Sequence, residues 1–143
     1  MNKYEIYTRA NHESFENVPR LPVYLRSAGY KKLESGTLES SPELHSPFFE
    51  IIWCKRGVGE VFLYNEAFSL LANDIFFYHP NERHKMRSLS DDFEVYWATF
   101  NGPYAVSFFD GYGYPRKMHS MEKCPVELFE KIRHQISDPS PLV

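Results

Sequence analysis

Short runs of β-branched and aromatic residues follow one another through the middle of this 143-residue chain. The runs are about four to eight residues long, and turn residues recur about every 8–12 residues. This spacing is typical of an antiparallel sandwich or barrel. The expected strands span residues 23–30, 48–55, 60–64, 68–72, 75–78, 83–89 and 93–100.

Composition supports this interpretation and narrows the class of partner. The chain has 12 Phe, 10 Tyr and 2 Trp, which favours a β-rich fold with a wide or ligand-lined interior. Its length suits one domain with a single core. The net charge is −3 and the 16 basic residues are scattered, so this segment makes a poor partner for nucleic acid.

The pattern changes after residue 101, where two helices are predicted. Pro103 suits a first helical turn, and Gly111 and Gly113 are natural stops. A second helix begins near Pro125, and its apolar positions fall on one face: Val126, Phe129, Ile132 and Ile136. We therefore divide the chain into an N-terminal arm (1–20), a β-barrel domain (21–101) and a helical segment (102–143). The arm is mixed polar and is expected to become ordered only where something holds it.

Nothing in the sequence indicates export or membrane insertion. The first twenty residues lack the apolar core of a secretory signal, and no run approaches the ~18 apolar residues of a membrane helix. Cys54 and Cys124 show no zinc or redox spacing, and we expect two reduced thiols. The sequence predicts a soluble cytoplasmic protein.

Three segments, taken in order, resemble the N-terminal cupin domain of AraC-type transcriptional regulators. The first is "EIIWCKRGVG", a glutamate followed by two turn glycines: Glu50, Gly57 and Gly59. The second is "NDIFFYHPNERH", where Asn73 replaces the usual glycine, a change that Asn tolerates because it adopts left-handed turns. The third is "WATF", leading directly into a helix. The resemblance covers about residues 23–136.

This resemblance implies a mainly β fold, a cupin-like antiparallel β-barrel (jelly roll) followed by C-terminal α-helices. It also implies an effector-sensing domain that binds a small polar ligand such as a sugar, forms a homodimer and has no cofactor or enzymatic activity. In such regulators a helix-turn-helix region follows the cupin domain. That region is absent from this chain, so we expect a sensor fragment that reaches DNA only through a C-terminal domain.

Strand alternation predicts which side chains face the interior. If Glu50 points inward, so do Ile52, Cys54 and Arg56, whereas Ile51 and Trp53 face away. Tyr78 and Tyr96 are expected on the opposite face from the ligand.

The resemblance places Arg56 and Trp97 on the ligand face. An aromatic ring packs against sugar C–H groups, and a guanidinium offers paired donors to hydroxyls or a carboxylate. His84 and Met86 share a face, and with Glu50 they complete the predicted ligand-binding set.

A metal site is the main alternative. Metal-dependent cupins carry a His-x-His-x(3–4)-Glu segment and a later histidine, and the matching positions here are Glu43, His45, Glu50 and His84. A metal, if bound, would be held by His45, Glu50 and His84, as in a cupin isomerase or dioxygenase. However, His45 lies in a Ser/Pro-rich loop, and a direct Glu50–His84 contact is equally natural, so no metal is expected. A third possibility is a dimerisation module whose barrel is filled by its own side chains.

Overall fold

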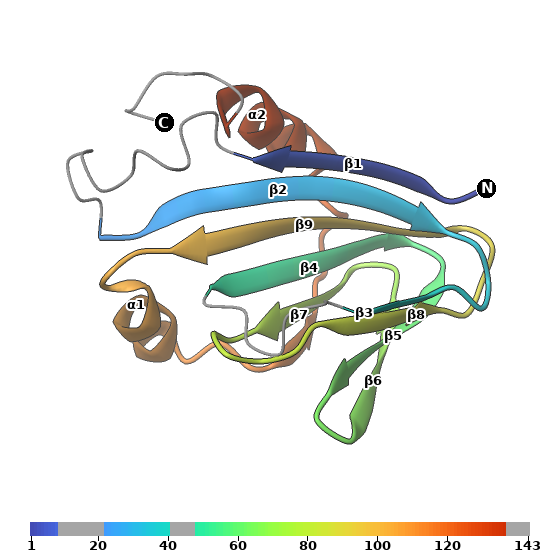
Figure 1. Cartoon of the computed structure of the whole chain (residues 1–143), viewed down its shortest axis with the longest axis horizontal. Coiled ribbons are helices and arrows are strands. Elements are labelled where there is room, and N and C mark those ends of the chain that lie inside the picture. Colours follow the sequence, from blue (N-terminus) through green and yellow to red (C-terminus); the bar gives the residue numbers. More distant parts are fainter. Residues whose placement is uncertain (9–21, 41–47, 137–143) are drawn as a thin grey trace.

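Two antiparallel sheets enclose the main core in this computed structural model, which describes residues 1–8, 22–40 and 48–136 (Figure 1). The six-stranded sheet has the order β1-β2-β9-β4-β7-β10. Its strands are β1 (Lys3–Thr8), β2 (Tyr24–Leu33), β9 (Phe93–Asn101), β4 (Phe49–Arg56), β7 (Asp74–Tyr78) and β10 (Lys117–His119). The four-stranded sheet consists of β3 (Leu38–Ser40), β8 (Lys85–Ser88), β5 (Val58–Leu63) and β6 (Glu66–Leu71).

The core between the sheets follows from the two-residue alternation of the strands. Ile52 and Phe76 from the six-stranded sheet pack with Val61, Leu70 and Met86 from the four-stranded sheet, all at most 4% exposed. Gly57 makes the sharp turn between β4 and β5, which belong to different sheets. Its φ of 82° is a left-handed conformation that glycine adopts without strain.

The outer face of the six-stranded sheet carries a second cluster covered by α2 (Val126–Ile136). Tyr96 contacts Phe129 with ring centroids 5.2 Å apart, and Ala28 and Ala98 belong to the same cluster. Figure 1 shows α2 lying over β1 and β2. The other helix, α1 (Ala105–Tyr112), follows β9 and ends at Gly113, whose φ is 62°. Gly113 is thus the predicted stop, whereas Gly111 lies inside the helix.

The predicted mainly β fold with two C-terminal helices is confirmed, and every predicted strand has an observed counterpart. Three short strands were not predicted: β1, β3 and β10. β1 falls in the segment predicted as an arm and pairs with β2 along six residues, so part of that segment is held in the sheet. Residues 9–21 and 41–47 lie outside the described residues. Neither helix, within those described ranges, has the length and apolar character that crossing a membrane requires.

Candidate functional site

A cavity of about 400 Å³ opens between the two sheets. Its apolar lining includes Ile6, Ile52, Met86 and Trp97. Polar groups line the rest: Lys31, Glu39, Ser40, Glu50, Tyr78 and His84. Lys85 also borders it. The side chains of the protein therefore leave open space between the sheets. The alternative of a dimerisation module had assumed a barrel that is filled by its own side chains.

Glu50 and His84 form the main polar contact of the cavity. Glu50 lies in β4 and His84 directly precedes β8, and His84 Nδ1 lies 2.5 Å from Glu50 Oε2. Both side chains are largely buried, with exposed fractions of 10% and 16%. The other ring nitrogen of His84, Nε2, is buried and has no hydrogen-bond partner in the described part of the chain. The carboxylate thus fixes the orientation of the imidazole.

Tyr78 stacks on His84, with ring centroids 4.3 Å apart and an interplanar angle of 25°. Its hydroxyl donates to the carbonyl of Phe62 or Lys85, at 2.6 and 3.0 Å. Burial raises the pKa of Tyr78 to about 12, so the phenol stays neutral. The prediction that Tyr78 faces away from the ligand is wrong, because β7 pairs with β4 in a register that sets Tyr78 directly opposite Glu50. Tyr96 does face away, as predicted.

The Trp97 indole packs over Gly29, its cross-strand partner in β2. A Cβ on Gly29 would lie 2.3 Å from Trp97 Cζ2 and 2.6 Å from the Glu5 carbonyl oxygen. Only glycine fits at this close approach. The indole is thereby positioned along the wall of the cavity, next to β1.

At another part of the lining, the Lys31 Nζ lies 3.0 Å from Glu39 Oε1. Both residues lie between the predicted strands 23–30 and 48–55, so the alternation argument did not include them. The alternation of β2 places Lys31 on the same face as Gly29 and Leu33, and this was the signal that could have identified it.

The structure brings together four of the five predicted ligand residues: Glu50, His84, Met86 and Trp97. Arg56 does not line the cavity. A register shift between Cys54 and Arg56 interrupts the alternation of β4, and the Arg56 side chain is 61% exposed with Nε 3.6 Å from Glu94 Oε2. Bulges of this kind re-aim side chains, which a strict two-residue period does not anticipate.

The described residues do not make up a metal site. Across residues 1–8, 22–40 and 48–136, no group of three or more His, Cys, Asp or Glu side chains is placed to hold a metal ion. Glu50 and His84 are engaged with each other, and His45 lies outside the described residues. Both cysteines are free, and burial raises the pKa of each thiol to about 12, which leaves them protonated and unreactive.

Comparison with solved structures shows that the fold is a cupin barrel. The Cnp3 cupin domain of Schizosaccharomyces pombe is 12% identical with a TM-score of 0.52, covering 80% of this chain and 72% of that one. A cupin 2 conserved barrel domain protein from Salinispora arenicola is 14% identical with a TM-score of 0.51, covering 78% and 84%. A predicted oxalate decarboxylase from Thermotoga maritima is 20% identical with a TM-score of 0.50, covering 68% and 82%.

No curated protein sequence matches the chain. A family profile does match it, that of the AraC-like ligand binding domain, over residues 35–138. This range contains the turn glycine Gly57, the Glu50–His84 contact and the cavity wall at Trp97. The chain therefore belongs to the AraC-like ligand-binding domain family, as its sequence motifs had indicated.

Proposed function

We propose that this domain senses a small polar effector, such as a sugar, in the cavity between the two sheets. The observation that carries the proposal is the cavity itself, where an indole and a glutamate–histidine pair line the same space. Trp97 offers an apolar surface to the C–H groups of a ring-shaped ligand, and the Glu50 carboxylate accepts hydrogen bonds from its hydroxyl groups. Family membership supports binding of a small molecule.

Occupancy would act on an attached DNA-binding domain, in the context of a cytoplasmic homodimer. The turn between β7 and β8 offers a connection from the cavity to the helical segment (102–143). Glu82, in that turn, is 5% exposed, accepts a hydrogen bond from the His79 amide at 2.5 Å and forms an ion pair with Arg116. Arg116 lies between α1 and β10. Such a regulator has two conformations, which differ in how the DNA-binding domain is positioned. The effector must bind these two conformations with different affinity, because only then does it shift their populations.

A thermal-shift screen of neutral sugars and sugar acids tests the proposal. A ligand that stabilises the wild type should stabilise Trp53→Ala as well, because Trp53 lies on the opposite face of the same sheet. The matched variant Trp97→Ala should bind about tenfold more weakly, which corresponds to about 1.4 kcal/mol. Equal binding by both variants would remove Trp97 from the site, and a failure of every sugar and acid would refute this effector class.

A metal-dependent cupin enzyme is the second candidate, favoured by one observation. The buried Nε2 of His84 lacks a partner among the described residues, and an imidazole nitrogen is a common metal ligand. Elemental analysis of the purified protein separates the two functions. Stoichiometric transition metal in the wild type that is lost in His84→Ala would favour the enzyme; the sensor proposal expects none.

A further inference from the structure

Three cations lie in a row on the outer face of the four-stranded sheet, and one of them, Lys85, also borders the cavity. Met86 and Ser88 of β8 point into the core, with 4% and 0% exposed, so Lys85 and Arg87 alternate to the outside. The side chain of Arg83 reaches the same face, because its Nε donates to Ser40 Oγ at 3.2 Å and Ser40 is directly opposite Lys85. We call Arg83, Lys85 and Arg87 the β8 cation row.

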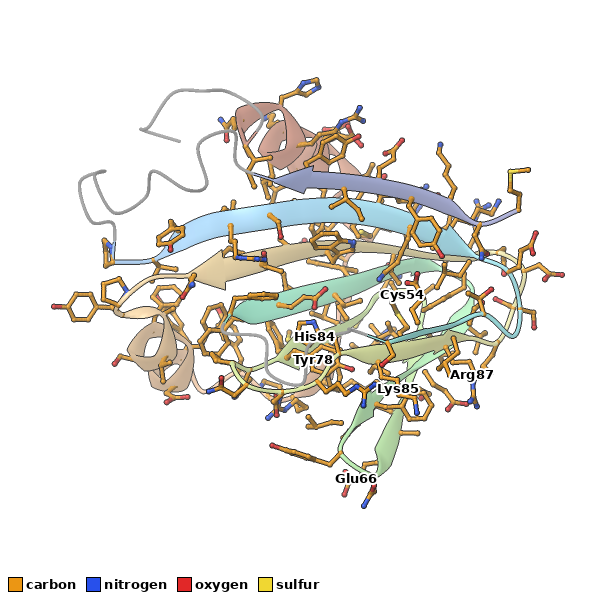
Figure 2. All side chains as sticks on the ribbon, in the orientation of Figure 1. Cys54, Glu66, Tyr78, His84, Lys85 and Arg87 are labelled. Atoms are coloured by element: carbon orange, nitrogen blue, oxygen red, sulfur yellow. The ribbon has the colours of Figure 1, made fainter. Side chains whose placement is uncertain are left out.

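Two members of the row make cation–π contacts with the ring of Phe62 on β5. The Lys85 Nζ lies 4.9 Å from the ring centroid and the Arg87 Cζ lies 5.6 Å from it. Phe62 is the cross-strand partner of Lys85. Cation–π contacts of this kind restrict the long side chains, so the row is partly ordered before any partner arrives. Figure 2 labels Lys85 and Arg87, and also His84 and Tyr78 of the cavity.

No described carboxylate lies within 4 Å of the β8 cation row, although Glu60 of β5 is the cross-strand partner of Arg87. Most other cations of the barrel lie within 4 Å of a carboxylate, as Lys31 does with Glu39, Lys117 with Asp74 and Arg116 with Glu82. None of the three row residues has such an ion pair in the described ranges. The row is therefore a local surplus of positive charge on a chain whose net charge is −3.

We propose that the β8 cation row is a docking surface for an extended acidic segment of a partner protein. Alternate residues of a strand are about 6.5–7 Å apart, and an extended peptide with a carboxylate at every second position has the same period. Two carboxylates can then meet Lys85 and Arg87 in register, and a third can reach Arg83 directly before β8. β8 lies between β3 and β5 in the sheet, so its backbone is already paired on both sides. A peptide would therefore contact the side chains of β8 and would not add to the sheet as a further strand.

Nucleic acid fits this surface less well than an acidic peptide. Binding of single strands relies on aromatic rings that are open to base stacking. Phe62 is already engaged by Lys85 and Arg87. The row also contains only three cations, which gives a short phosphate-binding track.

Fluorescence anisotropy with a labelled peptide of alternating glutamate and serine tests the proposal. The wild type should bind this peptide, and binding should weaken as salt rises from about 50 to about 300 mM, because screening weakens exposed ion pairs. The variant Arg83→Glu/Arg87→Glu should bind about tenfold more weakly or not at all. Lys85 is left unchanged because it also borders the cavity.

The matched control is Lys123→Glu/Lys131→Glu, which makes the same charge change at two exposed residues in and before α2. It should bind the peptide like the wild type. If the double reversal fails to fold, Arg83→Gln/Arg87→Gln removes the charges with similar side-chain volume and should still weaken binding. Absence of peptide binding to the wild type, equal binding by the row variant, or tighter binding to a single-stranded oligonucleotide would each overturn the proposal. Effector binding in the cavity is measured separately and does not bear on it.

Discussion

The space beside Gly59 in β5 is too small for a methyl group. A Cβ at this position would lie 2.3 Å from Cζ of Phe93, whose ring is fully buried and cannot move aside. Overpacking of a closed core costs about 1–3 kcal/mol. We therefore expect Gly59→Ala to lower the free energy of unfolding by about that amount, measured by urea denaturation.

Gly111 provides the matched control. It lies inside α1, and a Cβ there would meet nothing within 4 Å. Because alanine loses less backbone entropy than glycine in a helix, Gly111→Ala should stabilise the protein by about 0.5–1 kcal/mol. Equal effects of the two substitutions would show that contact with Phe93 is not what requires glycine at position 59.

Single residues of the site could be predicted wherever a strand alternates regularly. Glu50, Ile52 and Cys54 face inward as the period predicts. Arg56 was the exception, since the shift in β4 lies between Cys54 and Arg56, at the end of the strand, and leaves no trace in the residue pattern. Tyr78 was assigned to the wrong face because its orientation depends on pairing with β4, which a single strand does not encode.

Among the elements, β10 pairs with β7 over three residues, and the Asp74 side chain adds further contacts to this pairing. This carboxylate accepts hydrogen bonds from the Leu71 amide at 2.8 Å and from the His119 ring at 2.7 Å. The Lys117 Nζ lies 3.5 Å from the same carboxylate. Burial alone would raise the pKa of Asp74, but the Leu71 hydrogen bond and the contacts with His119 and Lys117 hold it below its usual value. A carboxyl with a lowered folded-state pKa stabilises the fold above its unfolded pKa of about 3.9.

Replacing Asp74 by Asn should therefore destabilise the protein in a pH-dependent way. At about pH 7 we expect a loss of about 1–3 kcal/mol, typical for hydrogen bonds to a charged group. The difference from wild type should shrink as the pH falls below about 4 and through the folded pKa, because the wild-type carboxyl then becomes protonated as well. Thermal unfolding of the wild type and of Asp74→Asn, from about pH 7 to below about pH 4, measures this difference in stability.

His119→Ala is the control for this element. The His119 side chain is 61% exposed, so solvent screens its contact, and we expect a loss below about 1 kcal/mol. A constant difference between wild type and Asp74→Asn at every pH would contradict the role given to the charge.

Elements were predictable in proportion to their length and apolar content. β9, with nine residues and an apolar inner face, was predicted closely. β3 and β10 have three residues each and mixed polar sequences, so their strand character arises from pairing with β8 and β7. The His119–Asp74 contact was missed for the same reason, since it exists only once β10 is in place.

At the scale of the whole molecule, the order of strands decides what the cavity contains. β1 and β9 flank β2 in the sheet, although about ninety residues separate them in sequence. This order brings Ile6 to the cavity and the Glu5 carbonyl to the space beside Gly29 and Trp97. Local pattern could predict that Trp97 faces inward, but not that the first strand of the chain lies next to it.

Removing β1 should therefore change the surroundings of Trp97. In a Trp53→Phe background Trp97 is the single tryptophan of the chain, and its emission reports on its contact with water. A variant that lacks residues 1–8 should show red-shifted emission, because the indole loses the cover of the β1 backbone and of Ile6. Ile6→Ala keeps the strand and removes only the side chain that lines the cavity, so its shift should be smaller. Unchanged emission in the shortened variant would mean that β1 does not shield the cavity wall.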